Sequence, residues 1–389
     1  MDTKQLDSKY VANTYARFPV EIVSGKGAEV TDADGKNYID MSSGIAVNIF
    51  GVGDDEWKSA VINQLNLFQH TSNLYYSAPY AALAKLMCEK TGMKKAFFVN
   101  SGAEANECAI KLARAHGEKK KEKTGKDCFT IICLKNSFHG RTLATLSATG
   151  QDVFHKKFQP LVDGFVFAEA NDLDSVKKLI EENNCCAVLM EMIQGEGGVN
   201  VLDGDFVKGV YSLSKEIDLL FMVDEVQTGN GRTGKLYAYM NYGIIPDVFT
   251  TAKGLGGGLP IGACLMGEKA ENLFAPGDNG TTFGANPVVC AGAVSIMERL
   301  TDEFLSGVKA KGNYLKEKLS ALDGVKSVSG MGLMLGVETE KDANEVIAKA
   351  RENGVLLIKA KNKIRLLPCL TISFEQLEKV VDVIGECLK

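Results

Sequence analysis

Two ionisable residues stand directly after short apolar segments near the middle of the 389-residue chain. Asp224 follows Leu219–Val223, and Lys253 follows Val248–Ala252 and precedes a glycine-rich stretch. Largely apolar runs of this length are typical of buried parallel strands, and ligands of open α/β sheets bind beyond the carboxyl ends of such strands. The two positions therefore predict a carboxylate and an amine that face one ligand-binding crevice.

This pair of groups suits one cofactor in particular. An amine can form a Schiff base with a carbonyl compound, and a buried acid can pair with a pyridinium nitrogen, which are the contacts that pyridoxal 5′-phosphate (PLP) needs. Either residue alone has a simpler explanation, Asp224 as a helix cap or turn residue and Lys253 as a solvated loop residue. Together, with the flanking glycines, the two residues favour a PLP site.

The elements that must position this pair follow the pattern of an α/β protein. Apolar segments separated by helical stretches predict a mostly parallel sheet covered by helices. These segments lie at 96–99, 131–134, 187–190, 219–223 and 248–252. From about residue 301 the pattern changes to the helices and strands of a compact α+β unit. Near the N-terminus, Ala28–Ile39 with Asp34-Gly35 in its middle predicts a β-hairpin.

Two longer motifs carry a resemblance to a known family. The segments DEVQTGNGRTG (224–234) and TTAKGLGGGLPIGA (250–263) resemble the cofactor region of the class III, PLP-dependent aminotransferases. The resemblance extends from about Tyr15 to Leu370. It implies a fold-type I transferase with a large PLP-binding domain (49–290), a smaller C-terminal domain (291–389) and an N-terminal segment (1–48) that packs with the smaller domain. It also implies a homodimer with shared active sites.

The predicted strand 96–99 leads into a candidate phosphate site. Asn100 to Glu104 are mostly small residues that precede the helical segment 108–116, and a strand, small residues and a helix N-terminus together bind phosphate through backbone N–H groups. Ser101 as a helix cap, with Glu104 completing a capping box, is a compatible structural explanation. The segment SGAEANE (101–107) matches the family motif, which implies that Ser101, Gly102 and Ala103 hold the PLP phosphate.

The resemblance assigns three further cofactor contacts. Phe138 is expected to stack on the pyridine ring, although an aromatic residue at a strand end is more often part of the core. Gln227 is expected to hydrogen-bond the ring 3-oxygen, and Thr282 to reach the PLP phosphate of the other subunit. His139, beside Phe138, is predicted to be a satisfied loop histidine.

Four residues are expected at the substrate site: Tyr15, Arg141, Glu196 and Arg365. An arginine without an obvious partner suits bidentate carboxylate recognition. The resemblance implies that Arg141 holds the distal carboxylate, with Tyr15 nearby, and that Arg365 holds the α-carboxylate of glutamate. Glu196 is expected to pair with Arg365 when the reacting end of the substrate has no carboxylate. The nearby Glu191 is expected to be structural.

The implied reaction is PLP-dependent transamination, with Lys253 as the proton-transferring base and acid and Asp224 as the partner of the pyridinium nitrogen. The motifs are most similar to those of family members that act on N-acetyl-L-ornithine and 2-oxoglutarate in arginine biosynthesis. Ornithine, succinylornithine and 4-aminobutyrate are alternative amino donors. A glutamate-1-semialdehyde aminomutase and a non-catalytic PLP-binding regulator are remoter alternatives.

Composition excludes several other classes. The net charge is −5, and the basic run Lys119–Lys126 is interrupted, so no nucleic-acid partner is expected. No apolar stretch is long enough to span a membrane and the N-terminus has no apolar signal region, which predicts a cytoplasmic protein. The ten cysteines form no C-x-x-C pair and there are only four histidines, so buried thiols are expected and no metal site. The chain departs from the family at Gly51–Asp55, where many relatives have G-H-x-H-P.

Overall fold

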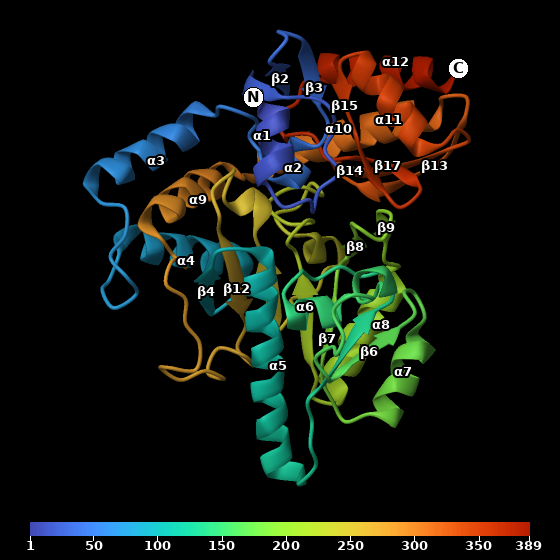
Figure 1. Ribbon diagram of the computed structural model, residues 1–389. Helices are drawn as coiled ribbons and strands as arrows, with labels where there is room; N and C mark the ends of the chain where they lie inside the picture. Colours follow the sequence, from blue (N-terminus) through green and yellow to red (C-terminus); the bar gives the residue numbers. More distant parts are fainter.

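A seven-stranded sheet forms the centre of the lower part of the molecule in the computed structural model, which describes residues 1–389 (Figure 1). Strand β12 runs antiparallel to both of its neighbours, while the other strands run parallel. In order across the sheet the strands are β4 (Lys95–Val99), β12 (Gly262–Met266), β11 (Val248–Thr251), β10 (Leu220–Asp224), β7 (Cys185–Met190), β5 (Thr130–Leu134) and β6 (Phe165–Ala168). The predicted mostly parallel sheet is confirmed, and β6 and β12 are additions to it.

Both faces of this sheet are buried, which explains why its strands are apolar without alternation. Successive side chains of a strand point to opposite faces. On β5, Ile131 belongs to the apolar cluster formed with helix α5 (Gly102–Thr124), whereas Ile132 belongs to the larger cluster that includes helix α8 (Gly204–Glu216). The sheet is therefore a rigid layer between helices, and its strand ends are fixed in space.

Helix α5 shows how local sequence sets an element's limits. Its N-cap is Ser101, whose Oγ accepts a hydrogen bond from the N–H of Glu104 at 3.2 Å, and it ends at Gly125, which has a left-handed conformation. The helix is much longer than the segment 108–116 expected from the apolar pattern, and its mostly exposed C-terminal end extends below the sheet (Figure 1). The Glu104 carboxylate accepts from the N–H of Asn100 at 2.7 Å, so the expected capping box is not formed.

The remaining helices of the lower part cover its edges and faces. Helices α3 and α4 both pack against α9, α4 also contacts β4, and α7 contacts β6. Their bounds are α3 (Asp55–Leu67), α4 (Ala78–Thr91), α6 (Leu143–Ala148), α7 (Leu173–Glu182) and α9 (Pro287–Arg299). Two short strands, β8 (Ile193–Gln194) and β9 (Asn200–Val201), pair beside the large sheet. These elements close the core below the strand ends.

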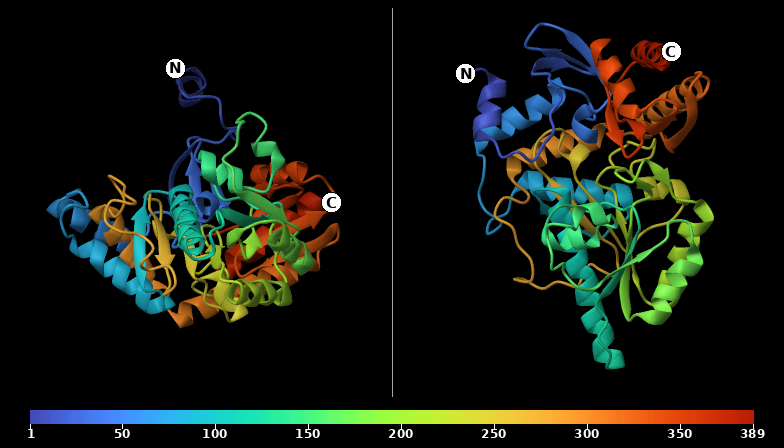
Figure 2. Two further views of the ribbon diagram at one scale, coloured as in Figure 1. Left: turned by 90° about the horizontal axis from the view of Figure 1, so that it is seen from below. Right: turned by 45° about the vertical axis from the view of Figure 1, so that its right-hand side comes forward.

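Two four-stranded sheets and three C-terminal helices lie in the upper part, together with the N-terminal helices α1 (Thr3–Tyr10) and α2 (Ser43–Ala46) (Figures 1 and 2). One sheet has the order β13 (Val325–Met331), β14 (Met334–Thr339), β17 (Lys363–Leu366) and β16 (Ile358–Ala360). The other has the order β1 (Ile22–Lys26), β2 (Glu29–Asp32), β3 (Asn37–Asp40) and β15 (Val355–Leu356). The three C-terminal helices are α10 (Asp302–Ser320), α11 (Ala343–Glu352) and α12 (Phe374–Leu388).

The second of these sheets joins the two ends of the chain. Strands β2 and β3 pair antiparallel, which confirms the predicted hairpin, and β3 pairs parallel with β15 from the C-terminal region. Both termini lie in the upper part of the molecule (Figures 1 and 2). The division into domains at residues 48 and 290 stays a prediction, and helix α9 spans the second boundary.

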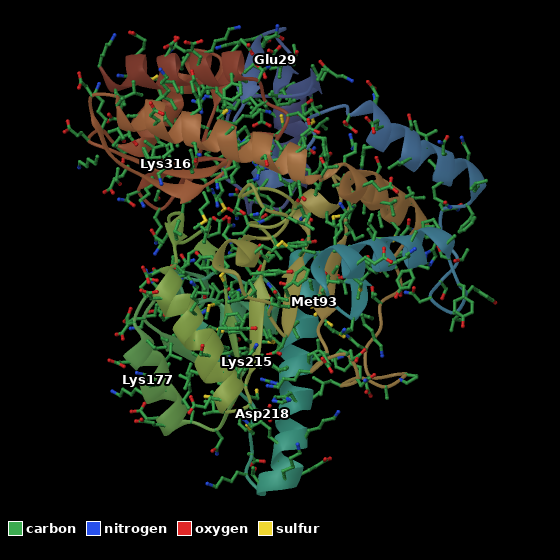
Figure 3. The ribbon with its side chains drawn as sticks, turned by 180° about the vertical axis from the view of Figure 1, so that it is seen from behind. Glu29, Met93, Lys177, Lys215, Asp218 and Lys316 are labelled. Atoms are coloured by element: carbon green, nitrogen blue, oxygen red, sulfur yellow. The ribbon has the colours of Figure 1, made fainter.

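The carboxyl ends of the parallel strands face the upper part. Asp218, which precedes β10, lies far down the large sheet, whereas Glu29 and Lys316 lie in the upper part (Figure 3). The chain runs up β10 from Asp218 and reaches Asp224 at the junction of the two parts. This is the crevice in which a ligand of an open α/β sheet is expected.

Three further features bear on function. All ten cysteines are free thiols, and all except Cys88 are buried. No group of three or more His, Cys, Asp or Glu side chains lies close enough together to hold a metal ion. None of the helices combines the length and the apolar character that crossing a membrane requires.

Candidate active site

The strand register brings the predicted site residues to one place. Asp224, the last residue of β10, is level with Thr250 of β11, and Val223 is level with Met190 of β7. Beyond these ends lies a cavity of about 410 Å³. The predicted residues that line this cavity are Ser101, Gly102, Ala103, Phe138, Arg141, Asp224, Gln227 and Lys253.

Lys253 has an unusual environment for a lysine. It opens the short helix η3 (Lys253–Leu255) with φ of +45°, a left-handed conformation that is uncommon for a residue with a side chain. Its amine has no hydrogen bond or ion pair within the chain. Burial lowers the pKa of Lys253, although Glu196 and Asp224 oppose the shift with their negative charges. The geometry thus holds an unpaired amine, more readily neutral than an ordinary lysine, inside the cavity.

Asp224 is held by three donors. One carboxylate oxygen, Oδ2, lies 2.8 Å from Nδ1 of His139 and accepts a hydrogen bond from Nδ2 of Asn106, also at 2.8 Å. The other oxygen, Oδ1, accepts only from the N–H of Val226, at 3.0 Å. Because Asp224 is 4% exposed, this network fixes its orientation toward the cavity.

The expectation that His139 is a satisfied loop histidine is wrong. Its side chain is buried and pairs with Asp224, and its Nε2 has no hydrogen-bond partner. The partner comes from a residue 85 positions away, so nothing next to His139 in the sequence could indicate it.

The N-terminus of α5 forms one wall of the cavity. The backbone N–H groups of Gly102 and Ala103 have no acceptor within the chain, because the first N–H groups of a helix have no partner in the preceding turn. A Cβ atom at position 102 would lie 2.6 Å from Cγ1 of Val226. The absence of a side chain at Gly102 therefore keeps this wall open toward the two N–H groups.

Phe138 and Arg141 also line the cavity. The Arg141 guanidinium lies 4.3 Å from the ring centroid of Phe154 and 5.5 Å from that of Phe138, and the two rings pack edge to face. Arg141 has no hydrogen bond or ion pair, so its donors are free for a ligand. The aromatic faces hold the guanidinium by cation–π attraction without occupying those donors.

Glu191 connects the end of β7 to two loops around the cavity. Its carboxylate accepts from the N–H of Phe138 at 2.9 Å and from the N–H of Gly195 at 3.1 Å. Burial raises the pKa of Glu191 to about 7, although the nearby His139 opposes the shift. These contacts position Phe138 from below.

Glu196 and Arg365 form a partly buried ion pair in contact with Gln227. Nη1 of Arg365 lies 2.5 Å from Oε1 of Glu196 and donates to Oε1 of Gln227 at 3.1 Å. Gln227 lines the cavity, and its Nε2 donates to Glu196 at 3.3 Å. Burial alone would raise the pKa of Glu196, but the charge and hydrogen bond of Arg365 outweigh it and the pKa is lowered.

The structure does not bring Tyr15 or Thr282 to this cavity. Tyr15 is 73% exposed and lies beside Arg17, and Thr282 is exposed. The neighbouring Thr281 accepts a hydrogen bond from Nδ2 of Asn100, which lines the cavity. The expected roles of Tyr15 and Thr282 stay predictions.

Sequence reasoning missed several cavity residues. They are Val47, Asn100, Asn106, Gly140, Val226, Ala252 and the segment 258–261. Asn106 is the most informative of them, because it is a polar residue on the buried face of α5 and stands within the SGAEANE motif. A fully buried polar side chain needs hydrogen-bond partners, and this requirement was the signal by which Asn106 could have been found.

The departure from the family motif at Gly51–Asp55 has its own contacts. The N–H of Val52 donates to the carbonyl of Gly27, and Asp54 caps α3 by accepting from the N–H of Trp57 at 2.8 Å. Asp54 also pairs with Arg299 of α9 at 2.9 Å. The altered loop thus contacts the turn between β1 and β2 in the upper part and helix α9 in the lower part.

Comparison with known proteins places this arrangement in a family. The family model described as aminotransferase class-III matches residues 10–388. The chain belongs to the class III aminotransferases. This aminotransferase is 49% identical over 387 residues to the acetylornithine aminotransferase of Haemophilus ducreyi, covering 99% of this chain and 98% of the relative. It is 45% identical to the acetylornithine aminotransferase of Aquifex aeolicus, covering 97% of this chain and all of the relative.

Solved structures agree with this assignment. The N-acetylornithine aminotransferase from Stenotrophomonas maltophilia superposes on this aminotransferase with a TM-score of 0.84 and 31% identity, covering 99% of this chain and 98% of that one. A structure of the ornithine aminotransferase from Toxoplasma gondii, with partial occupancy of PLP at its active site, gives a TM-score of 0.93 and 30% identity, covering 99% and 93%. The expected fold-type I architecture is confirmed.

The enzyme is PLP-dependent, and its cavity fits that cofactor. The free N–H groups of Gly102 and Ala103 suit a phosphate, and the missing side chain at Gly102 leaves room for one. The unpaired amine of Lys253 suits an aldehyde, and Oδ1 of Asp224, which has only one donor, suits a protonated ring nitrogen. Phe138 lies in the wall between them, where a flat ring can stack.

Proposed function

We propose that this aminotransferase transfers the terminal amino group of N-acetyl-L-ornithine to 2-oxoglutarate, giving N-acetyl-L-glutamate 5-semialdehyde and L-glutamate, a step of arginine biosynthesis. The proposal rests on one structural observation above all: Arg141 lines the cavity without a partner, whereas Arg365, in contact with the cavity-lining Gln227, is paired with Glu196. The names of the relatives with 49% and 45% identity support this amino donor. A cytoplasmic location stays a prediction.

The cofactor supplies the electron-withdrawing ring, and the protein supplies proton transfer and charge. Lys253 takes the proton from the substrate carbon that bears the amine and later returns one, because its amine is buried, unpaired and more readily neutral than an ordinary lysine. Asp224 stabilises the positive charge of the ring nitrogen. The donors from His139, Asn106 and Val226 keep this carboxylate oriented.

The two arginines would serve the two carboxylates of glutamate. Arg141 holds the distal carboxylate, since its guanidinium is positioned by Phe154 and Phe138 and its donors are free. Arg365 holds the α-carboxylate, which lies beside the reacting carbon. For acetylornithine, the α-carboxylate and the acetylated amine are far from the reacting end, so Arg141 binds the carboxylate of this substrate as well.

Glu196 allows Arg365 to tolerate both substrates. The reacting end of acetylornithine is a CH₂ group, and an unpaired buried arginine beside it would be costly. Glu196 supplies the missing negative charge, because its Oε1 lies 2.5 Å from Nη1 of Arg365. Glutamate binds by displacing Glu196 from Arg365.

Initial rates with four amino donors test this proposal. The donors are N-acetylornithine, N-succinylornithine, ornithine and 4-aminobutyrate, each with 2-oxoglutarate. We expect the highest kcat/KM with N-acetylornithine, by at least about tenfold over ornithine, which corresponds to about 1.4 kcal/mol of differential binding. If the highest kcat/KM is found with ornithine, succinylornithine or 4-aminobutyrate, that donor would replace N-acetylornithine in the proposal. Conversion of glutamate 1-semialdehyde without consumption of 2-oxoglutarate would indicate an aminomutase. Binding of PLP without turnover of any donor would indicate a non-catalytic regulator.

We also infer that the active enzyme is a homodimer in which Thr282 of one subunit contacts the PLP phosphate of the other. Large exposed apolar side chains gather in the segment that contains Leu74, Tyr75 and Tyr76, and Phe283 stands beside Thr282. Nearby loops 70–77 and 279–285 line a second cavity of about 490 Å³. Light scattering is expected to give twice the chain mass of 41.9 kDa. A monomer that binds PLP and turns over would contradict the shared site.

A further inference from the structure

The side chain of Asn106 is the centre of a buried hydrogen-bond network beneath the cofactor cavity. It is 1% exposed, on the face of α5 that packs on the sheet. Its Nδ2 donates to Oδ2 of Asp224 at 2.8 Å and to the backbone oxygen of His139 at 2.7 Å. Its Oδ1 accepts from Oγ1 of Thr250 at 2.6 Å. All of the N–H groups of this amide are therefore used, and its oxygen is engaged.

The orientation of this amide is determined by its partners. A backbone oxygen and a carboxylate oxygen can only accept hydrogen bonds, so the NH₂ group of Asn106 must face His139 and Asp224. The amide oxygen then faces Thr250, and the Thr250 hydroxyl must donate. Thr250 is level with Asp224 on the neighbouring strand, so the sheet register itself positions the residue that orients Asn106.

The network has a consequence for Asp224. Oδ2 accepts hydrogen bonds from Asn106 and from His139, whereas Oδ1 accepts only from the N–H of Val226. Oδ1 is thus the oxygen with free capacity to accept a further hydrogen bond. Asn106 also holds the backbone of His139, so it fixes both members of the Asp224–His139 pair.

We propose that Asn106, oriented by Thr250, is a positioning residue for PLP: it fixes Asp224 so that Oδ1 faces the pyridinium nitrogen. The inference rests on the proposed cofactor contact of Asp224. The amide donor also stabilises the negative charge of the carboxylate, because hydrogen bonds to a charged group are stronger than those between neutral groups. Asn106 thus acts on PLP through Asp224.

Variants that preserve shape separate this role from simple packing. Thr250→Val removes the hydroxyl that orients the amide, and Thr250→Ser keeps it. Asn106→Asp keeps the size of the side chain but replaces the donor by an oxygen that faces the carboxylate of Asp224, a repulsive arrangement. Each protein is prepared without cofactor, and its Kd for PLP, the absorbance spectrum of bound PLP and its Tm are measured.

We expect the Kd for PLP to rise at least about tenfold in Asn106→Asp and about threefold in Thr250→Val, the scale of one lost hydrogen bond to a charged or neutral group. Thr250→Ser is expected to bind PLP like the parent. The pH dependence of the absorbance of bound PLP is expected to differ from that of the parent in both Asn106→Asp and Thr250→Val, because the contact between Asp224 and the ring nitrogen is weaker.

Two results would overturn the inference but not the proposed function. In the first, the parent binds PLP, and Asn106→Asp and Thr250→Val bind it with the same Kd and spectrum. In the second, Thr250→Ser loses as much affinity for PLP as Thr250→Val. If Asn106→Asp does not fold, the Thr250 pair decides the question. A parent that binds no PLP would overturn the proposed function, and this inference with it.

Discussion

At the scale of single residues, Lys253 combines three properties that define its role. Its backbone is left-handed, its amine has no partner, and burial lowers its pKa. A lowered pKa means that the neutral, nucleophilic form of the amine is present at a lower pH than for an ordinary lysine, whose pKa is about 10.4. A strained residue at a cavity wall is a position where function compensates for a conformational cost.

The first prediction concerns covalent attachment at Lys253. The parent is expected to show the absorbance of a PLP Schiff base near ~420 nm, and borohydride is expected to fix PLP to the peptide that contains Lys253. Lys253→Ala is expected to lose both the fixed PLP and transamination, because no other lysine lines the cavity. Lys269→Ala, which changes a partly buried lysine paired with Asp218, serves as the control and keeps the label. Label on another lysine in the parent would show that the assignment is wrong.

The second prediction concerns the charge of Asp224. Asp224→Asn keeps the shape but removes the anion that holds the proton on the ring nitrogen. Turnover is expected to fall at least about 100-fold, the scale of losing one preorganised electrostatic contact. The control is Asp247→Asn, which changes an aspartate whose carboxylate accepts from the N–H of Phe221 near the other end of β10. Asp224→Asn turnover close to that of the control would mean that the ring nitrogen has another partner.

Sequence alone identified Asp224 and Lys253 because both stand at strand ends, and strand ends meet at one edge of a parallel sheet. It could not identify Asn106 or the role of His139. The partners of Asn106 are 118 and 144 positions away, in Asp224 and Thr250, and only the folded sheet brings them together.

At the scale of elements, the N-terminus of α5 is the feature that fits a phosphate. Its first N–H groups are free, and the helix dipole places positive charge there. The motif SGAEANE predicts phosphate binding at this helix end, because small residues between a strand and a helix allow a ligand to approach the backbone closely. The length of the helix was underestimated, since its exposed second half carries no apolar pattern.

The third prediction tests this helix end. Gly102→Ala would place a methyl group 2.6 Å from Cγ1 of Val226, so Val226, which lines the cavity, or the start of α5 must shift. The Kd for PLP is expected to rise about tenfold or more, a loss of about 1.4 kcal/mol. Gly204→Ala is the matched control, because Gly204 opens helix α8 and has no atom within 4 Å of an added Cβ. Equal PLP affinity in both variants would show that the N-terminus of α5 does not hold the phosphate.

Two strands of the large sheet, β6 and β12, were not predicted from the apolar segments. Strand β12 is also antiparallel to both of its neighbours. The reason lies in its connection: between β11 and β12 there is only the segment 252–261, which contains the short helix η3. A parallel pair would need a longer crossover, usually a full helix.

At the scale of the whole molecule, the Glu196–Arg365 pair joins the two parts. Glu196 follows β8 beside the large sheet, and Arg365 lies on β17, level with Gly336 of β14 in the upper sheet. Arg365 is 3% exposed, and Glu196 is its ion-pair partner. Because the pKa of Glu196 is lowered, its carboxylate stays charged at neutral pH and the pair persists until the pH falls through that lowered value.

The large-scale arrangement was predicted better than the contacts between its parts. The resemblance implied both arginines and Glu196, but the sequence gives no distance between residues 169 positions apart. It also gave no indication that Gln227 contacts both members of the pair while it lines the cavity.

The central claim is that one site serves two unlike amino donors because Glu196 masks Arg365. It is tested most directly by stopped-flow measurement of each half-reaction, with acetylornithine alone and with glutamate alone, in the parent and in Glu196→Gln. The variant keeps the shape of Glu196 but leaves the arginine charge free. We expect the efficiency of the glutamate half-reaction to rise and that of acetylornithine to fall, so that their ratio shifts by about tenfold or more toward glutamate. Equal slowing of both half-reactions would contradict the masking account and make Glu196 a structural support.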